Sequence, residues 1–469
     1  LFLLPMATDA DARHAQRETF LRHKFEVGTR VEEGRGTCLY AARDFAAGEV
    51  VLSSEPLASL VFPSRVSELC NQCFRKAEAP RTLQHCVACK AAWYCSAECQ
   101  KVAWERGRHK LECSIAGEVA AQCKFMPEIA QQDLRMLIRV ALMRISPSSD
   151  APELQGVFVA RYDEVLRMPA HLDETTLKDP DRMDGNRMLA DAALKLLDSR
   201  KLRAKKGLDW ARLPALEDLV KVLCCLACND FSIWDELILP LGLGVYPLGA
   251  LLNHSCEPNC VLYYAPKTHA QVIRTIRHVK EGEELCHPYI DLACTTPERR
   301  AKLDASYHFR CDCSRCAAGT LDHRLASGTA EPPSHSQYLQ GVVGLQSAED
   351  SKELRDACNI LQGVEREWRA ARDPVDLKLL SLHSKLLQGW LELGEAEAAI
   401  EACRQLVEGY RVIYPPAHPL LGLQLYTLGN LEVDAGDRSA GERHLLEARG
   451  ILTITHGEAS RMVQGLDVL

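Results

Sequence analysis

The chain contains the sequence Asn253-His254-Ser255-Cys256-Glu257-Pro258-Asn259-Cys260, in which an amide, an imidazole and a thiol stand close together. Further along, Gly282-Glu283-Glu284 leads into Tyr289, and three cysteines follow between residues 311 and 316. Three closely spaced thiolates need a fourth ligand to complete a tetrahedral zinc site, and Cys256 supplies it. The predicted ligands of this zinc are Cys256, Cys311, Cys313 and Cys316.

The composition is that of a globular chain with more than one domain. With 469 residues, 47% of them hydrophobic and 26% charged, the chain is too long for one compact core, so two or three domains are expected. Its net charge of −8 argues against bulk electrostatic affinity for nucleic acid as the main activity. A basic peptide is a better-matched partner.

The sequence carries no clear membrane or secretion signal. Its longest apolar run, Leu237 to Leu252, is interrupted by Pro240 and Pro247, so a membrane-spanning helix is not expected. The five residues before Met6 are too few for a signal peptide, and Met6 is a candidate start. Because disulfide scaffolds are short and secreted, the twenty-one cysteines indicate metal binding in a soluble intracellular chain.

A second group of metal ligands lies between residues 70 and 113. A gap of two residues lets one turn present two sulfurs to one ion, and eight such ligands make two closed structural zinc sites. Four ligand pairs rarely arise by chance, which disfavours scattered core cysteines. The pairs Cys95/Cys99 and His109/Cys113 predict short helices that each place two ligands on one face. The eight ligands are Cys70, Cys73, Cys86, Cys89, Cys95, Cys99, His109 and Cys113.

The same segment is locally basic. Residues 70–113 contain eight Lys or Arg and four Asp or Glu, which gives +4 in an acidic chain. Two interpretations stay open: a docking surface for protein or DNA, or the solvated face of a small zinc module.

Residues 70–113 resemble a MYND zinc finger, with Trp93-Tyr94 before Cys95 and with Trp104 after Cys99. The resemblance implies that the ligands of the two zinc ions interleave along the chain. One ion would be held by Cys70, Cys73, Cys95 and Cys99, and the other by Cys86, Cys89, His109 and Cys113.

The sequences on either side of the finger resemble the two parts of a SET domain. Alone, Gly34-Arg35-Gly36-Thr37 before short alternating strands is no more than a hairpin signal. Followed by the Asn253–Cys260 sequence and the Gly-Glu-Glu segment, it matches the order of the family. A turn flanked by glycines lets the backbone approach a ligand closely, and the resemblance implies that Arg35 and Thr37 contact S-adenosylmethionine.

The resemblance assigns further residues to this cofactor. Asn229, Asn253 and His254 would contact its methionine end, where an asparagine offers both a donor and an acceptor to an amino-acid head group. Outside its motif, His254 would be interpreted as a buried core histidine. Phe309 would pack against the adenine. Ala250 stands where many relatives have a serine, which removes a side-chain hydrogen bond there.

Tyr289 and Tyr307 occupy the two tyrosine positions of the family and are the predicted catalytic residues; Tyr289 would also contact the cofactor. A lysine amine must lose its proton before it attacks a sulfonium methyl, which requires an apolar channel with oriented oxygens rather than a strong base. Taken alone, either tyrosine would be a half-buried aromatic residue. Pro288 departs from the family pattern, and because proline donates no backbone hydrogen bond, we expect altered strand pairing beside Tyr289.

The remaining segments have mostly helical periodicity. Residues 114 to about 225 are expected to form helices that wall one side of the substrate channel. Residues 320–340, which contain Gly328, Pro332 and Pro333, predict a linker or loop.

The tail predicts paired helices. Leu393–Ala398 and Ala435–Ala440 recur at an offset of 42 residues, a pattern that favours tetratricopeptide-like helix pairs, with an ordinary helical bundle as the alternative. Residues 376–469 contain eight basic and thirteen acidic side chains, and the resulting charge of −5 could attract a basic partner.

Taken together, these features resemble the SMYD family of protein lysine methyltransferases. The implied fold is α+β and multidomain. The expected segments are the amino-terminal SET part at 22–69, a MYND zinc finger at 70–113, a helical SET insertion at 114–226, the SET core at 227–300, a cysteine-rich post-SET flap at 301–318 and a helical tetratricopeptide-like domain at 341–469.

The resemblance implies S-adenosylmethionine-dependent methylation of lysines in histones or other proteins, with about three zinc ions per chain. It also implies a chain of the nucleus and cytoplasm, which we expect to be monomeric and free of membrane contacts. Two other interpretations stay open. The first is a zinc-dependent adaptor that keeps the fold but is catalytically weak, motivated by Ala250 and Pro288. The second is a tetratricopeptide-like scaffold whose finger recruits partners.

Overall fold

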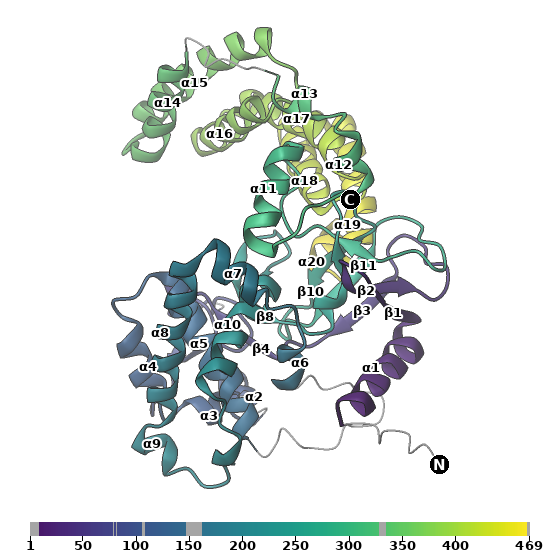
Figure 1. Ribbon diagram of the computed structural model, residues 1–469. Helices are drawn as coiled ribbons and strands as arrows, with labels where there is room; N and C mark the ends of the chain where they lie inside the picture. The colour runs from purple at the N-terminus through teal and green to yellow at the C-terminus, as the bar shows by residue number, and fades with distance from the viewer. Residues whose placement is uncertain are drawn as a thin grey trace.

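The computed structural model describes residues 9–77, 79–80, 82–105, 108–146, 162–327 and 334–466. Small β-sheets lie in the middle of the molecule, with the finger and the insertion helices below them and the carboxy-terminal helices above (Figure 1). The predicted α+β multidomain class is confirmed. Within the described ranges, no helix has the length and apolar character needed to cross a membrane.

The strands are short, and they pair both with the next strand along the chain and with strands distant in sequence. Strand β11 lies between β10 and β3, strand β8 lies between β4 and β7, and β9 pairs with β12 in parallel. The bounds are β1 Val27–Glu32, β2 Gly36–Ala41, β3 Val50–Ser54, β4 Ala58–Val61, β5 Gln84–His85, β6 Trp93–Tyr94, β7 Asp230–Trp234, β8 Pro240–Val245, β9 Asn253–His254, β10 Cys260–Tyr264, β11 Gln271–Thr275 and β12 Cys286–His287.

A hydrophobic core beneath the β10–β11–β3 sheet includes Leu252 and Leu285, which directly precede β9 and β12. In β11 the residues Gln271, Ile273 and Thr275 are buried and alternate with less buried neighbours, as expected for a strand with one face on the core. The helix α1, Asp9–Phe25, closes this core with Leu21 and Phe25. No prediction covered α1, because its sequence has little apolar periodicity beyond that pair.

The finger contains β5, β6 and two helices. Helix α2 begins two residues after Cys95 and contains Cys99, and helix α3 contains His109 but ends one residue before Cys113. The expectation that each short helix carries two ligands is therefore wrong in detail, since each holds one ligand while the second lies just outside it. The bounds are α2 Ala97–Glu105 and α3 Arg108–Glu112.

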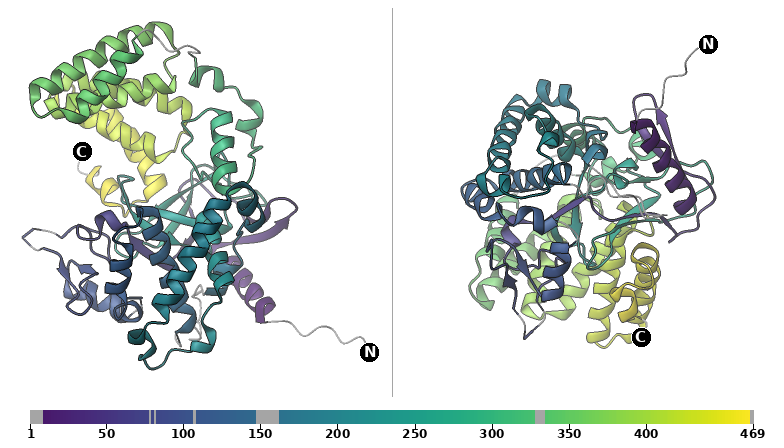
Figure 2. Two further views of the ribbon diagram at one scale, coloured as in Figure 1. Left: turned by 60° about the vertical axis from the view of Figure 1, so that its left-hand side comes forward. Right: turned by 90° about the horizontal axis from the view of Figure 1, so that it is seen from below.

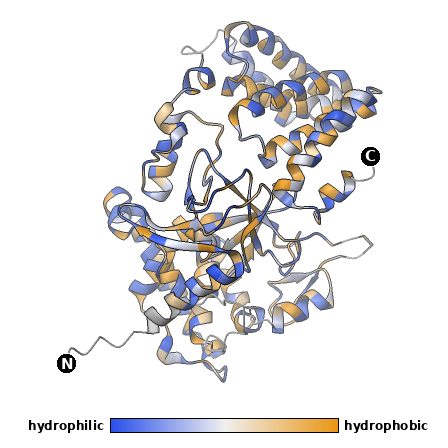
Figure 3. Cartoon of the chain, turned by 90° about the vertical axis from the view of Figure 1, so that its right-hand side faces the viewer, coloured by the Kyte–Doolittle hydropathy of each residue, from blue (hydrophilic) through white to orange (hydrophobic). Residues whose placement is uncertain are grey.

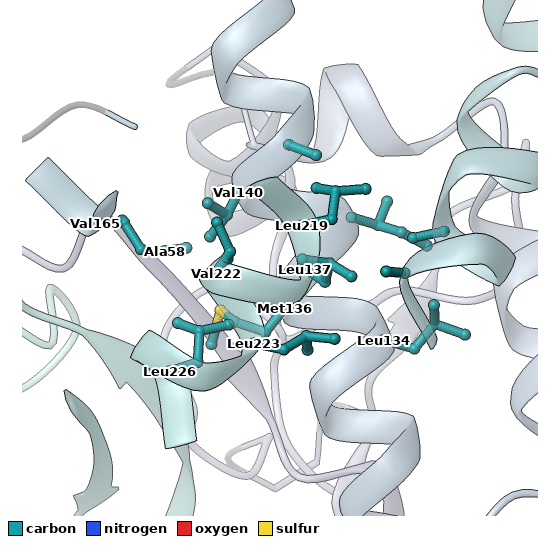
Figure 4. Close-up of a cluster of buried hydrophobic side chains, with 14 of the residues drawn as sticks. Ala58, Leu134, Met136, Leu137, Val140, Val165, Leu219, Val222, Leu223 and Leu226 are labelled. Atoms are coloured by element: carbon teal, nitrogen blue, oxygen red, sulfur yellow. The ribbon is translucent and has the colours of Figure 1, made fainter. Parts of the chain in front are cut away.

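The insertion is helical and shares a core with the β4–β8–β7 sheet. Apolar side chains of α5 and α10 interlock, with Leu137 and Val140 facing Leu219 and Val222 (Figure 4). This packing orients the end of α10, which leads directly into β7. The bounds are α4 Ala116–Cys123, α5 Glu128–Ile145, α6 Tyr162–Leu166, α7 Leu172–Lys178, α8 Pro180–Leu197, α9 Arg200–Arg203 and α10 Leu216–Asn229.

After the sheets, the chain forms helix pairs. Orange and blue segments alternate along these helices (Figure 3), so each helix buries one face. The bounds are α11 Thr296–Tyr307, α12 Ser314–Ala318, α13 Asp322–Leu325, α14 His335–Ser347, α15 Ser351–Ala371, α16 Leu377–Leu393, α17 Ala396–Ile413, α18 Pro419–Asp434, α19 Arg438–His456 and α20 Arg461–Leu466. The last helices curve back toward the sheets (Figure 2).

The two glycines of the tail motif end helices. Gly394 (φ 73°) follows α16 and Gly436 (φ 93°) lies two residues after α18, and this left-handed conformation is the usual way for glycine to stop a helix. The predicted linker at 320–340 is partly wrong, because α13 and the start of α14 lie in it. Ser334 accepts a buried hydrogen bond from Trp368 Nε1 (3.0 Å), which fixes the beginning of α14. Gly328, Pro332 and Pro333 lie outside the described residues.

Candidate active site

The Asn-His-Ser-Cys motif and the segment between Glu284 and Tyr289 form one parallel ladder. Asn253 pairs with Cys286 and His254 pairs with His287, and the amide of Ser255 donates to the carbonyl of His287 (3.2 Å). The ladder brings residues about thirty positions apart side by side and places Tyr289, two residues after His287, next to His254.

Pro288 ends this ladder without releasing Tyr289. The pairing is kept up to His287, and the next available amide, that of Tyr289, donates to Nδ1 of His254 (2.9 Å). A side chain thus replaces the backbone partner that a longer strand would supply. The backbone pairing thus stops before Tyr289, as expected of the proline, while the two residue pairs before Pro288 are intact.

Tyr289 is fixed at its backbone, its ring and its hydroxyl. The hydroxyl donates to the carbonyl of Leu252 (2.7 Å), and the ring lies 4.9 Å from that of Tyr307 and 5.3 Å from that of His254. The hydroxyl of Tyr307 donates to the carbonyl of Tyr289 (3.4 Å). Burial raises the pKa of Tyr289, and burial followed by the charge of Asp230 raises the pKa of Tyr307 to about 12. Both hydroxyls therefore remain neutral near pH 7.

His254 links the tyrosine to the cysteine-rich flap. Because Nδ1 accepts from Tyr289, the proton resides on Nε2, which lies 3.2 Å from Sγ of Cys256. Burial lowers the pKa of His254 to about 4, so the ring is neutral. Its ring also lies 5.9 Å from that of Phe309, which places this flap residue beside the Asn-His strand.

Arg35 and Asn253 meet at a carboxylate that the sequence analysis did not single out. Arg35 forms an ion pair with Glu284 (2.7 Å), and Nδ2 of Asn253 donates to Glu284 (3.0 Å) and to Sγ of Cys38 (3.1 Å). Glu284 belongs to the quoted Gly-Glu-Glu segment, and that segment was the available signal. Thr37 is partly buried in β2, two residues after Arg35.

Two amide oxygens are open to a ligand. Nδ2 of Asn229 donates to the carbonyls of Pro169 (2.9 Å) and Cys225 (2.8 Å), so its donors are used within the protein. Among the described residues, no hydrogen bond reaches Oδ1 of Asn229 or Oδ1 of Asn253. A carboxamide oxygen is an acceptor, and an ammonium head group is a ligand that fits such acceptors. Ala250 lies in the short helix before Asn253 and offers no hydroxyl.

Three groups of side chains have the composition and spacing of zinc sites. In each group the four ligand atoms lie within 4.8 Å of one another. Zinc–sulfur bonds of about 2.3 Å in a tetrahedron separate neighbouring sulfurs by roughly 3.8 Å, and Cys73 Sγ to Cys95 Sγ is 3.6 Å. The groups are Cys70, Cys73, Cys95 and Cys99; Cys86, Cys89, His109 and Cys113; and Cys256, Cys311, Cys313 and Cys316.

The third group joins the Asn-His strand to the flap. Sγ of Cys256 lies 3.5 Å from Sγ of Cys316 and 4.0 Å from Sγ of Cys311. Helix α11 starts with a capping box made by Thr295 and Glu298 and ends at Tyr307, just before these cysteines. A metal in this group would therefore hold Tyr307 against the ladder that carries Tyr289.

The SET domain family model matches residues 36–290, which is more than half of the chain. The chain belongs to the SET domain family. The matched segment encloses the finger and the helical insertion, so this SET domain is split in sequence.

Relatives match this SET domain protein over almost its whole length. It is 27% identical to "Histone-lysine N-methyltransferase SMYD3" of Mus musculus over 436 residues, covering 93% of the chain and 94% of the relative. It is 26% identical to "N-lysine methyltransferase SMYD2" of Homo sapiens, covering 91% of the chain and 93% of that relative. "Histone-lysine N-methyltransferase ASHR1" of Arabidopsis thaliana is 25% identical, with 92% of both chains covered. These matches confirm the predicted SMYD membership.

Proposed function

We propose that this protein is an S-adenosylmethionine-dependent protein-lysine N-methyltransferase. The observation that supports this most directly is the pair of neutral tyrosines, Tyr289 and Tyr307. They are anchored to each other, and Tyr289 is anchored to the carbonyl of Leu252, at the junction of the Asn-His strand and the flap.

Several side chains at the site have hydrogen-bonding atoms that are not used within the described part of the protein and could bind the cofactor. The free Oδ1 atoms of Asn229 and Asn253 would accept hydrogen bonds from the ammonium of the methionine end. Arg35 and Thr37 would bind from the hairpin, and Phe309 from the flap, with His254 and Tyr289 between them. When bound, S-adenosylmethionine supplies a methyl group on a positively charged sulfur.

The tyrosines suit an amine that must be neutral to react. Burial disfavours the charged form of a lysine amine, and a neutral phenol adds no negative charge that would hold the ammonium form. Tyr289 and Tyr307 can orient the amine through their oxygens while staying protonated themselves.

The zinc ions would be structural. Each of the three groups offers four protein ligands, which fills a tetrahedral site and leaves no position for a substrate. The outer contact from Nε2 of His254 to Sγ of Cys256 would couple the third site to the position of Tyr289.

The substrate is a protein lysine, in histones or in other proteins. One relative is named for histone lysine and another for lysine without a stated protein. A monomer acting in nucleus and cytoplasm fits this role, with the finger as a protein or DNA contact and the tail as a tetratricopeptide-like scaffold for basic partners. The catalytically weak adaptor gains no support, since Pro288 leaves Tyr289 anchored and no comparison favours it.

Radiolabelled methyl transfer to a histone mixture and to a cell extract tests the proposal. Incorporation into protein, stable to conditions that remove ester-linked methyl groups, is expected. A preparation that binds S-adenosylmethionine measurably but labels nothing would contradict it and favour the adaptor. A peptide array with mass readout would then give the lysine and the number of methyl groups.

A further inference from the structure

A cavity of about 1230 Å³ lies between the finger, the insertion and the edge of the SET core. Its walls come from the finger, from helices α4 and α5, from the turn before β4 and from the loop between β10 and β11. Neither Tyr289 nor Tyr307 lines it. The finger and the insertion helices occupy the lower left of Figure 1, away from the carboxy-terminal helices. The cavity is therefore separate from the proposed catalytic residues.

Two arginines one helical turn apart on α5 line this cavity, and their surroundings differ. Arg139 forms a two-armed ion pair with Glu112 and also donates to the carbonyl of Ser59. Arg135 forms no hydrogen bond or ion pair with any of the described residues. Burial, followed by the charge of Arg139, lowers the pKa of Arg135. The cavity thus contains a partly buried cation, and Glu112, the carboxylate whose charge acts on it, is already paired with Arg139.

The other basic side chains that line the cavity differ in whether they have a partner. The Arg75 side chain contacts the Cys73 thiol, so its charge serves the first zinc group. Lys124, at the end of α4, lines the cavity and has no carboxylate within ion-pair distance among the described residues; its ammonium lies over the ring of Phe125. Arg135 lies close enough to Cys123, the residue before Lys124, for its charge to act on that thiol, so the cavity holds two cations without a carboxylate partner among the described residues.

A partly buried guanidinium without a counterion costs free energy, because it has lost part of its hydration and gained no hydrogen bond in return. An anion entering the cavity would remove that cost and could take two parallel hydrogen bonds from the planar guanidinium. We propose that this cavity is a docking site for an acidic segment of a partner protein, with Arg135 receiving a carboxylate side chain.

The shape of the site favours a peptide over a nucleic-acid duplex. Arg135 lies inside a cavity that also has apolar walls, including Val66, Val119 and Ile138, which can pack the aliphatic parts of an extended peptide. The phosphates of a duplex are fixed on a wide rod and contact exposed basic surfaces, so they are poorly suited to an enclosed arginine. The proposal does not depend on methyl transfer.

Binding of a fluorescein-labelled hexaglutamate peptide to the zinc-loaded full-length chain tests it, measured by fluorescence anisotropy at physiological ionic strength. Arg135→Gln should weaken binding at least about tenfold, because it removes a charged hydrogen-bonding partner. Lys110→Gln is the matched control, since it removes one positive charge from the exposed surface of the finger outside the cavity; it should change binding less than about twofold. Arg135→Lys should lie between the two.

Two further measurements keep the outcome clear. The melting temperature of Arg135→Gln should equal or exceed that of the unmodified chain, because an unpaired charge is removed. Hydrogen exchange in residues 128–145 should slow when the peptide is added. Absence of binding, equal binding by the Arg135→Gln variant, or Arg135-dependent binding of inorganic phosphate or a DNA duplex but not of the peptide would each overturn the proposal.

Discussion

At the scale of single residues, the site is defined by which atoms are already bonded. Asn229 and Asn253 use their amide nitrogens within the protein and leave their oxygens free. The motifs identified these residues from the sequence, because residue type and order carry that information. They could not show which atom is free, since this depends on Pro169 and Glu284, which lie far away in the chain.

Asp230, the first residue of β7, should make the fold less stable at alkaline pH. Burial, followed by the charge of Asp133, raises its pKa from an ordinary 3.8 to about 7, and Arg182 opposes this rise. A carboxyl whose pKa is raised by folding contributes most to the free energy of unfolding at pH values below its unfolded pKa. This contribution is lost as the pH increases through the folded pKa. Asp230→Asn should therefore raise the free energy of unfolding by ~2 kcal/mol at pH 8, since part of the effect is shared with Asp133.

Urea unfolding of both proteins at pH 5 and pH 8 measures this. The stabilisation should be present in full at pH 8 and should fall to less than half of its pH 8 value at pH 5, because pH 5 lies between the unfolded and the folded pKa of Asp230. The exposed Asp163→Asn variant serves as the control for loss of one surface charge. A stabilisation that is independent of pH would show that the ionisation of Asp230 is not its cause.

At the scale of elements, two short segments do most of the positioning. The β9–β12 ladder aligns His254 with His287, and the third cysteine group fastens the flap to it. The sequence predicted the ligands of this group because cysteine spacing is itself the signal. It did not predict where helices α2 and α3 would begin and end around their ligands, because tertiary packing and the metal groups set those boundaries more than local propensity does.

Cys256→Ser should remove one zinc and loosen the flap. The unmodified chain should contain about three zinc ions by metal analysis, and the variant about two, because a serine hydroxyl is a poor zinc ligand at neutral pH. Hydrogen exchange in residues 296–318 should become faster, while the finger is unaffected. Cys224→Ser is the matched control, since Cys224 is buried next to Asn186 outside the three groups. Two zinc ions in the unmodified chain would mean that Cys256 and the flap cysteines bind no zinc.

At the scale of the whole molecule, the carboxy-terminal helices are fastened to the catalytic part. The hydroxyl of Tyr414 donates to Asp291 (2.8 Å), and Arg315 donates both to the carbonyl of Ile413 (3.0 Å) and to that of Leu292 (3.1 Å). Asp291, which lies just after Tyr289, and Arg315 in the flap thus both bind residues at the end of α17. These contacts were not predictable, because each joins parts of the chain that no periodicity relates.

Tyr414→Phe should weaken this attachment. A buried hydrogen bond to a carboxylate contributes about 1–2 kcal/mol to the free energy of unfolding, and that amount should be lost in urea unfolding. Tyr410→Phe is the control, because the Tyr410 hydroxyl has no hydrogen bond in the described part of the chain. Equal losses in the two variants would mean that the hydroxyl of Tyr414 is not a specific contact.

The proposed role of Tyr289 is to orient the reacting amine of the lysine substrate. Methyl transfer and S-adenosylmethionine affinity should be measured on the same preparations of the unmodified chain, Tyr289→Phe and Tyr410→Phe. Tyr289→Phe should lower the transfer rate by about a hundredfold or more, the scale on which positioned oxygens act. Its cofactor affinity should stay within about threefold, because most proposed cofactor contacts come from other residues. An unchanged transfer rate in Tyr289→Phe would contradict this role of Tyr289. No transfer by the unmodified chain while it binds the cofactor would contradict the proposed methyltransferase activity.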